Sequence, residues 1–284
     1  MTLNIDIMKK IYNINSKDND YLHFLSLKNS RQKRNKNKEI FVESIKAIKV
    51  LSNNNYKIDS LIYNKNNLSI WAKEFIKKTN CKHFHITPQL LKELSDKENT
   101  SELIAIIKVE DKNINDLYKT IKNKTDSLIV LLDNISNKGN LGSIIRSCNA
   151  FEVDAIIISG NYSVDMYDPQ TIRSSLGGVF ATSIFKINSY KEFVDFYENF
   201  KKNQKDLQII GTSAKAKEYI QDIDYNKPTI VLIGNETIGL SRNYKEISNK
   251  LVKIPMSSKS VSSLNIACAT SIIISQINFL KNIK

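Results

Sequence analysis

An amide and a guanidinium lie six residues apart, as Asn140 and Arg146, in a stretch that begins Asn-Lys-Gly-Asn-Leu-Gly at residue 137. The stretch follows an apolar run at residues 128–132, typical of a buried strand, and leads into a helical pattern. It is therefore a turn at the carboxyl end of a strand, where ligands gather in open α/β sheets. Its polar groups could converge on one crevice and orient a polar substrate. Alone, it equally fits an ordinary strand–helix connection with a surface Arg.

Two further loops have the same character. After another apolar run, Gly234 and Gly239 flank Glu236, so the backbone can approach a ligand closely beside a carboxylate. Further on, a proline ends a strand, and Ser262 or Ser263 can cap the last apolar helix and leave backbone donors for a ligand. Each loop alone also fits a turn and a cap. Three such loops at strand ends in one domain favour a shared site.

Apolar strands alternating with helices must hold these loops in place. From residue 126 onward the strand candidates are residues 128–132, 155–159, 207–211, 229–233 and 251–254, and the helical candidates are residues 141–151, 190–202, 241–249 and 262–280. Near-continuous Val, Ile and Leu runs predict a parallel sheet covered on both faces. The alternation predicts a small α/β domain over residues 1–109, a polar linker over 110–125 and a second α/β domain over 126–284.

Positive charge is concentrated in the first part of this 284-residue chain, whose net charge is +13. Residues 1–125 carry 24 Lys and Arg against 14 Asp and Glu, whereas residues 126–284 carry 18 against 15. Residues 28–38 include six basic residues and no apolar or acidic one, which predicts a solvated basic loop that contacts phosphates. A polyanionic partner is the functional interpretation. Compositional bias toward Lys, Asn and Ile is the alternative.

Several classes of protein are disfavoured by the pattern of residues. Cys81, Cys148 and Cys268 are far apart and give neither a metal spacing nor a disulfide framework. His83 and His85 alternate, which predicts one face of a short strand and no metal site. There is no G-x-G-x-x-G or P-loop motif, no signal-peptide pattern and no run as long as a membrane span. We therefore expect a soluble protein of the reducing cytoplasm that uses no metal.

Together the three loops resemble the motifs of the SpoU/TrmH family of RNA ribose 2′-O-methyltransferases, in the SPOUT class. The matches are residues 140–146, residues 234–236 with Gly239, and residues 254–256 with 263–265. The resemblance implies an S-adenosylmethionine-dependent RNA (ribose-2′-O)-methyltransferase. It also implies an α/β fold with a C-terminal trefoil knot and a mostly parallel sheet. The first domain resembles, more loosely, the small RNA-binding domain often attached to this family.

The resemblance implies roles for single residues. It places Arg146 on the ribose 2′-hydroxyl, where the guanidinium, a poor base, either takes the proton in a shifted environment or orients the hydroxyl and stabilises charge. Asn140 and Glu236 would orient Arg146 or the ribose, and Ser263 and Asn265 would support the pocket. The expected cofactor contacts are Thr212, Gly234, Ile254, Met256 and Leu264. The expected RNA contacts are Arg173 and, in the basic loop, Arg31, Lys33, Arg34 and Lys36.

Two positions depart from the family pattern. Glu152 stands where members commonly have Gly, and residues 257–261 form a segment one residue longer than usual. No polar motif residue is lost, which favours an active enzyme. The separate basic domain favours rRNA over tRNA, with an antibiotic-resistance member of this layout among the options, and family members form homodimers. Two alternatives stay open: a non-catalytic RNA-binding or ribosome-assembly protein that retains the fold, and a nucleotide-binding protein without RNA.

Overall fold

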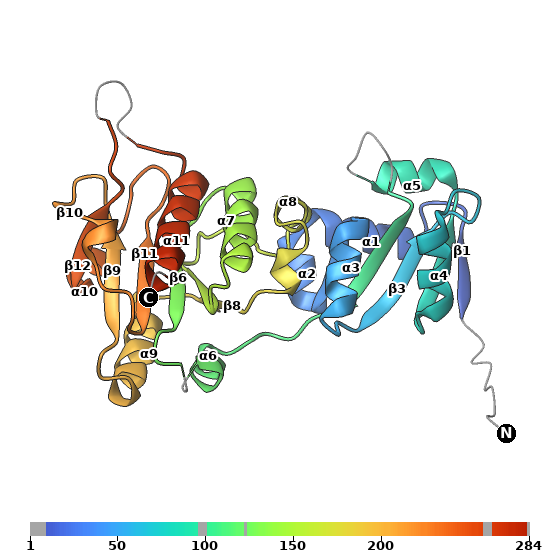
Figure 1. Cartoon of the computed structure of the whole chain (residues 1–284). Helices are drawn as coiled ribbons and strands as arrows, with labels where there is room; N and C mark the ends of the chain where they lie inside the picture. Colours follow the sequence, from blue (N-terminus) through green and yellow to red (C-terminus); the bar gives the residue numbers. More distant parts are fainter. Residues whose placement is uncertain (1–9, 96–100, 122–123, 258–262, 283–284) are drawn as a thin grey trace. The chain divides into compact units, whose positions relative to one another are not determined.

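The computed structural model describes residues 10–95, 101–121, 124–257 and 263–282 (Figure 1). Contacts between residues divide the chain into two compact units. Unit 1 runs to Glu110 and includes Tyr167–Arg173, and unit 2 comprises Asp111–Met166 and Ser174–Lys284. The short segment 167–173 therefore packs with unit 1 although the chain on both sides of it belongs to unit 2.

Unit 1 is a mixed five-stranded sheet with helices. Its elements are β1 (Ile11–Ile14), α1 (Asn19–Asn29), α2 (Arg31–Asn37), β2 (Glu39–Val42), α3 (Ile45–Asn53), β3 (Ile58–Tyr63), α4 (Ile70–Lys78), β4 (Lys82–Ile86), α5 (Pro88–Leu94) and β5 (Leu103–Lys108). The strand order is β1-β4-β3-β5-β2, with β5 antiparallel to both of its neighbours. Alternating apolar residues bury Phe41, Ile62, Phe84 and Ile104 in one core with α1 and α5.

The prediction of a solvated loop at residues 28–38 is wrong, because most of this segment forms helix α2. Ser30 caps this helix by accepting a hydrogen bond from the Lys33 N–H at 3.3 Å, and Lys38 ends it in the left-handed conformation. The run contains Lys, Arg, Gln and Asn but neither Gly nor Pro, so nothing in it opposes a helix.

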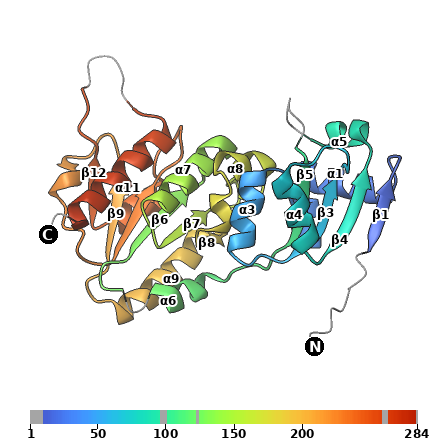
Figure 2. The ribbon, with the colours of Figure 1, turned by 45° about the vertical axis from the view of Figure 1, so that its right-hand side comes forward.

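Unit 2 is a seven-stranded parallel sheet covered by helices on both faces (Figure 2). Its elements are α6 (Ile114–Ile121), β6 (Leu128–Asp133), α7 (Lys138–Ala150), β7 (Ala155–Ser159), β8 (Ile184–Ile187), α9 (Tyr190–Asn203), β9 (Gln208–Thr212), β10 (Glu218–Tyr219), β11 (Thr229–Ile233), α10 (Arg242–Ile247), β12 (Lys250–Lys253) and α11 (Ile266–Asn282). The order is β10-β12-β9-β11-β6-β7-β8, and every described pair of neighbouring strands is parallel. One further helix, α8 (Pro169–Ser174), lies almost entirely in the segment that packs with unit 1.

The buried strands explain the two covered faces. β6, β7 and β11 are buried along their whole length, so each presents apolar side chains to both sides. One face packs against α6, α9 and α10, where Leu117 and Ile121 of α6 are fully buried. The other face carries α7 and α11, which pack together. The polar segment 110–125 is therefore not simply a linker, because its helix forms part of the core of unit 2.

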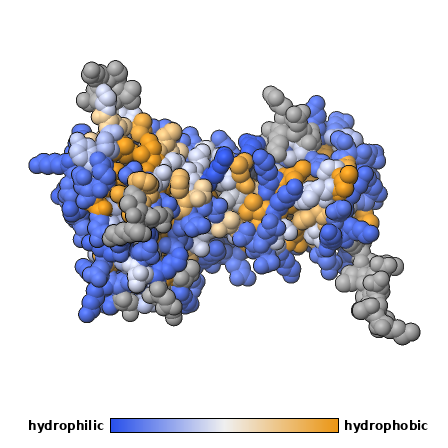
Figure 3. All heavy atoms as spheres, viewed as in Figure 1, coloured by the Kyte–Doolittle hydropathy of each residue, from blue (hydrophilic) through white to orange (hydrophobic). Residues whose placement is uncertain are grey.

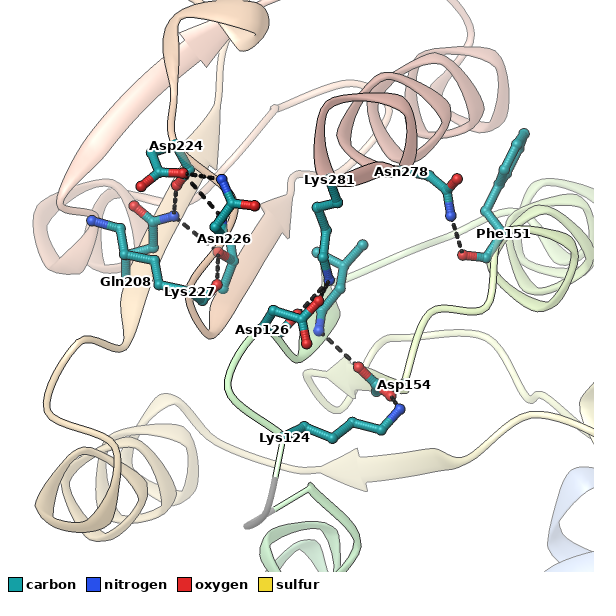
Figure 4. Close-up of polar contacts among 12 residues, drawn as sticks. Lys124, Asp126, Phe151, Asp154, Gln208, Asp224, Asn226, Lys227, Asn278 and Lys281 are labelled. Atoms are coloured by element: carbon teal, nitrogen blue, oxygen red, sulfur yellow. Dashed lines mark hydrogen bonds and ion pairs between the residues drawn. The ribbon is translucent and has the colours of Figure 1, made fainter. Parts of the chain in front are cut away.

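Polar contacts hold the amino-terminal ends of the strands in unit 2 (Figure 4). The Asp154 carboxylate accepts a hydrogen bond from the Leu128 N–H at 2.9 Å and pairs with Lys124. Lys281, in the last turn of α11, pairs with Asp126 at 2.9 Å. The Gln208 side chain donates to the Asp224 carbonyl at 2.7 Å. This edge of the sheet is occupied by structural contacts, which leaves the opposite, carboxyl-terminal edge for a ligand.

Glu152 adopts a left-handed conformation, with φ of 54°, directly after the C-cap Phe151 of α7. Glycine is favoured there because a β-carbon costs about 1–2 kcal/mol in this region. We expect Glu152→Gly to raise the free energy of unfolding by about 1 kcal/mol. The greater freedom of glycine in the unfolded chain offsets part of this gain. Urea unfolding of this variant and of Glu152→Ala, which keeps the β-carbon, measures the effect. Equal stability of the two variants would contradict this explanation.

The surface is mainly hydrophilic on the face drawn in Figure 3, and hydrophobic residues show there in separate patches. Across the described ranges, no helix has the combination of length and hydropathy that crossing a bilayer requires.

Candidate active site

Three loops meet at the carboxyl-terminal edge of the unit 2 sheet. They follow β6, β11 and β12; the second and third loops contain motif residues, and the first leads directly into helix α7, which contains residues 140–146. The connection after β6 leads into α7, the connection after β11 contains Glu236, and the connection after β12 leads to α11. Residues 258–262 of this last connection, including most of the segment judged longer than usual and Ser262, lie outside the described residues.

Glu236 binds the start of α7. Its carboxylate accepts hydrogen bonds from the Ser136 hydroxyl at 2.8 Å, from the Ser136 and Asn137 N–H groups at 3.3 Å each, and from the Asn140 side-chain amide at 3.2 Å. The carboxylate thus lies at the positive end of the α7 dipole and satisfies amides that the helix leaves unpaired. This interaction fixes the β11 loop against the α7 loop, although Glu236 and Ser136 are 100 residues apart in sequence.

The pKa of Glu236 is lowered by these contacts. Partial burial alone would raise it, but hydrogen bonds from the Glu236 backbone, Asn140 and Ser136 outweigh burial and hold the pKa below its ordinary value. The folded form therefore binds the proton less well than the unfolded chain. The resulting stabilisation is complete above the unfolded value of about 4.3 and is lost as the pH falls through the folded value.

We therefore expect the stability difference between wild type and Glu236→Gln to be constant between about pH 6 and 8 and to shrink below about pH 4.3. The glutamine keeps the shape but not the charge, so it isolates the ionised carboxylate. Urea unfolding of both proteins across this range tests the prediction. A difference that persists unchanged at acid pH would mean that the carboxylate is not ionised in the folded protein.

Asn140 links Glu236 to the third loop. Its side-chain oxygen accepts a hydrogen bond from the Asn265 amide at 3.2 Å, while its own amide donates to Glu236. The Asn265 side-chain oxygen in turn accepts from the Ala267 N–H at 2.9 Å at the start of α11. Asn265 thus performs the capping expected of Ser262 or Ser263, since Ser263 has no hydrogen bond to any other described residue. Three predicted catalytic residues therefore form one network.

The β11 loop is a tight, glycine-dependent turn. The Asn235 and Gly239 backbones pair with each other at 3.1 and 2.9 Å, and Gly239 has φ of 75°. A β-carbon on Gly234 would lie 2.0 Å from the Leu240 nitrogen, so only glycine fits. The Asn235 side chain donates to the Asn134 carbonyl at 2.7 Å, which ties the turn to the end of β6. The turn holds Glu236 in place.

A cavity of about 470 Å³ lies beside this network. Its lining combines apolar side chains with loop backbone and includes all five residues expected at the cofactor: Thr212, Gly234, Ile254, Met256 and Leu264. Ser263 and Glu236 also reach it. Sequence analysis missed three cations on its wall, Lys215, Lys245 and Lys253. Only Lys253, directly before the motif at residues 254–256, stood next to a motif, and the sequence did not mark it as a binding residue.

The cavity suits a nucleoside cofactor such as S-adenosylmethionine. The main-chain groups of Met256, Ser263 and Leu264 have no hydrogen-bond partner elsewhere in the described part of the chain, so they can bind the polar edges of a base and a ribose. No side chain would meet a β-carbon built on Gly239, so the backbone there is accessible. Apolar walls from Ile233 and Leu240 complete a site of the usual kind for a small molecule.

Arg146 lies outside the Glu236 network. It is exposed on α7, and its side chain has no hydrogen bond or ion pair within the described ranges. Arg146 and Asn140 do not touch each other, and α7 begins at Lys138, three residues earlier than predicted. Asn140 then lies in the first turn, and Arg146 follows about 9 Å along the axis and roughly 120° around it. Its guanidinium is available to a substrate.

The other expected RNA contacts have different surroundings. Arg173 is exposed on α8, and Lys33 and Lys36 are exposed on α2. Arg34 is only 2% exposed; its guanidinium donates to the Leu27 and Lys28 carbonyls at 2.8 and 3.0 Å and pairs with Asp168 at 3.5 Å. The assignment of Arg34 to RNA is therefore wrong, because a buried guanidinium that caps α1 cannot reach a phosphate.

Sequence analysis missed the residues that support the site. Ser136 and Asn137 bind Glu236, and Asn137 also caps α7 by accepting from the Asn140 N–H at 2.9 Å. Buried Asp133 accepts from the Ser241 N–H at 2.8 Å. An Asn three residues before Asn140 is an N-cap signal that was available in the sequence. In the described ranges, no three His, Cys, Asp or Glu residues gather as a metal site would require.

Comparisons with known proteins agree with the motifs. The model of the SpoU rRNA Methylase family matches residues 127–275, and that of the SpoU L30e-like domain matches residues 20–105. A 23S rRNA (uridine(2479)-2′-O)-methyltransferase from Streptomyces viridochromogenes is 31% identical over 263 residues, which cover 92% of this chain and 90% of that protein.

Solved structures share the fold. The SpoU methyltransferase AviRb from Streptomyces viridochromogenes, crystallised with the cofactor AdoMet, aligns with a TM-score of 0.86 at 30% identity and covers 92% of this chain and 97% of its own. An AdoMet-bound rRNA methyltransferase from Sinorhizobium meliloti aligns at 0.83 with 22% identity over 95% and 98% of the two chains, a likeness of fold alone. With a family match over half its length and a relative that spans nearly all of it, this chain belongs to the SpoU rRNA methylase family.

Proposed function

We propose that this protein transfers a methyl group from S-adenosylmethionine to a ribose 2′-hydroxyl of rRNA. The observation that carries the proposal is the cavity at the strand ends, bordered by the Glu236–Asn140–Asn265 network, in a chain of this family. The relative that is a 23S rRNA 2′-O-methyltransferase, similar over nearly the full length of both chains, supports rRNA as the substrate. A soluble cytoplasmic location follows from an rRNA substrate.

The residues of the cavity would divide the work of binding and positioning. When bound, S-adenosylmethionine supplies a methyl group activated on a sulfonium. Thr212, Gly234, Ile254, Met256 and Leu264 would hold this cofactor through backbone and apolar contacts. The Glu236–Asn140–Asn265 network keeps the three loops in one arrangement, so the nucleophile and the methyl group meet in a fixed geometry, which accounts for much of the rate in such reactions.

Arg146 would bind the ribose hydroxyl. A guanidinium presents five N–H donors and no acceptor, so it orients the hydroxyl oxygen and stabilises negative charge that develops on it. Ser263, on the cavity wall, would support the same pocket. Arg146 makes no contact with the network. Bound RNA or a second subunit would therefore hold its side chain against the ribose hydroxyl.

The proposal includes a homodimer and a knotted chain. Ile272 and Phe279 of α11 are 42% and 60% exposed, which leaves apolar surface for a second copy. β12 lies near one edge of the sheet, whereas α11, the next helix in the chain, packs against α7, which follows the inner strand β6. This path of the chain supports a trefoil knot around the cofactor site.

Lys33 and Lys36 on α2 are proposed to bind RNA phosphates. We expect Lys33→Gln with Lys36→Gln to weaken RNA binding and to lower the slope of log affinity against log salt by about 1 for each phosphate left without its lysine partner. Cofactor affinity should not change, because these lysines belong to unit 1 and the cavity to unit 2. Filter binding at several salt concentrations measures the slope. An unchanged slope would show that the two lysines are merely solvated.

Arg34→Met, on the same helix, tests a basic residue that supports the fold and does not bind RNA. It should destabilise the fold by about 3 kcal/mol, because it removes the buried guanidinium that donates to the Leu27 and Lys28 carbonyls and pairs with Asp168.

Mapping 2′-O-methylation in the host rRNA with and without the gene tests the function directly. A single nucleotide that loses its methyl group when the gene is deleted is the expected result. If all rRNA methylation persists and the purified protein binds rRNA without transferring a tritiated methyl group, the protein is an RNA-binding member that has kept only the fold.

A further inference from the structure

Helix α4 in unit 1 leaves part of its apolar surface accessible. Of its nine residues, all within the described ranges, Ala72 alone is buried, and Ile70 is 79% exposed. Trp71 and Phe75 are half-buried. The two rings are therefore largely covered, but each keeps a part of its surface that a ligand can reach.

The two rings form an aromatic platform by stacking on each other. Trp71 and Phe75, one helical turn apart, are stacked with centroids 5.0 Å apart and planes inclined by 19°. The Lys49 Nζ, from neighbouring α3, lies 4.8 Å from the centroid of a Trp71 ring. The ring of Trp71 thus already binds a cation on a flexible stem, which can swing aside for a ligand that combines a flat ring with negative charge.

Exposed lysines of α3 and α4 add positive charge to the helices that form this surface. Lys46 and Lys49 lie one turn apart on α3, and neither is buried. Lys78 follows Trp71 by seven residues, close to two full turns, so it lies on the same side of α4 and is exposed. Helix α4 carries one acidic residue, Glu74, against three lysines, so its charge is positive. An aromatic platform flanked by amines matches a nucleotide, whose base is flat and whose phosphate is anionic.

We propose that this α3–α4 surface, made of Lys46, Lys49, Trp71, Phe75 and Lys78, binds an unpaired nucleotide of the RNA, with its base stacked on Trp71 and its phosphate beside the lysines. Aromatic side chains hold single-stranded RNA in this way, whereas the bases of an A-form duplex remain stacked inside the helix. The inference rests on the proposed function in that RNA is the substrate. It adds that the substrate presents a loop or bulge to unit 1.

Trp71 is the only Trp in the chain, so its fluorescence reports on this surface alone. We expect a single-stranded oligoribonucleotide to quench it and the same sequence in a duplex to leave it unchanged. In fluorescence anisotropy with labelled single strand, Trp71→Leu should bind at least about fivefold more weakly, and Trp71→Phe should restore most of the affinity. Ile70→Ala, which removes exposed apolar area on the same helix but no ring, should bind like wild type.

The outcomes separate this surface from the enzymatic activity. Quenching by single strand without any methyl transfer would support the surface and sink the proposed function. Methyl transfer without quenching, or equal quenching by single strand and duplex, would overturn the surface and leave the function intact. Equal losses in Trp71→Leu and Trp71→Phe would also overturn it, because the ring would then play no part in binding.

Discussion

Replacing Arg146 with Ala should lower the rate of methyl transfer by about 10²–10³ and leave the affinity for S-adenosylmethionine unchanged. The affinity should hold because Arg146 is not among the residues that line the cavity. The rate should fall because the exposed guanidinium has no structural partner in the described ranges and is free to bind the reacting hydroxyl. Single-turnover methylation with tritiated cofactor and calorimetric titration of the cofactor measure the two effects.

Two variants on α7 sharpen this test. Arg146→Lys keeps the charge but not the planar fork of donors, so it should recover only part of the rate. Lys138→Ala removes an exposed cation from the first turn of the same helix and should behave like wild type. A similar loss in both alanine variants would mean that α7 contributes only general positive charge, and a loss of cofactor binding in Arg146→Ala would place the guanidinium in the cavity.

Replacing Gly234 with Ala should destroy the cofactor site. The added β-carbon would lie 2.0 Å from the Leu240 nitrogen and 2.2 Å from the Gly239 carbonyl carbon, and both are backbone atoms that cannot swing away. The turn must open, which costs about 1–3 kcal/mol or more and displaces Glu236 from α7. We expect cofactor affinity to fall at least about tenfold, or 1.4 kcal/mol, together with the midpoint of unfolding.

Gly239→Ala is the matched control in the same turn. Its β-carbon would meet nothing within 4 Å, but its φ of 75° makes any β-carbon costly by about 1–2 kcal/mol. We therefore expect a moderate loss of stability with weaker effects on the cofactor. If Gly234→Ala bound the cofactor as well as Gly239→Ala, the close approach of the two loop strands would not be what forms the site.

The sequence predicted the parts of unit 2 in which local pattern and tertiary structure agree. The strands Ala155–Ser159 and Thr229–Ile233 have the predicted bounds because unbroken apolar runs are stable only when both faces are covered. Strand β8 was missed because it is short and carries an exposed Lys186 between apolar residues. Helix α2 was missed because a polar run without an apolar stripe resembles a loop, although the buried Arg34 anchors it.

The site was predictable to a similar degree. The resemblance to the family identified Asn140, Glu236 and Asn265 as site residues. Their side chains imply hydrogen bonds, but the sequence does not show which pairs of them form. The hydrogen bonds of Glu236 with Ser136 and Asn137 join loops far apart in sequence, and no local pattern encodes that pairing. The sequence placed Arg146 on this helix, but its separation from Asn140 depended on where α7 begins, because Asn140 belongs to the first turn of the helix and not to the loop before it.

The segment Tyr167–Arg173, which leaves unit 2 and packs with unit 1, means that the polypeptide passes between the units three times. No single proteolytic cut can therefore release both units intact. A fragment ending at Glu110 would lack Asp168, the carboxylate that pairs with Arg34, and a fragment beginning at Asp111 would carry helix α8 without the surface that it packs against. The two units are interleaved pieces of one chain, so exchanging the first unit between relatives requires moving this segment with it.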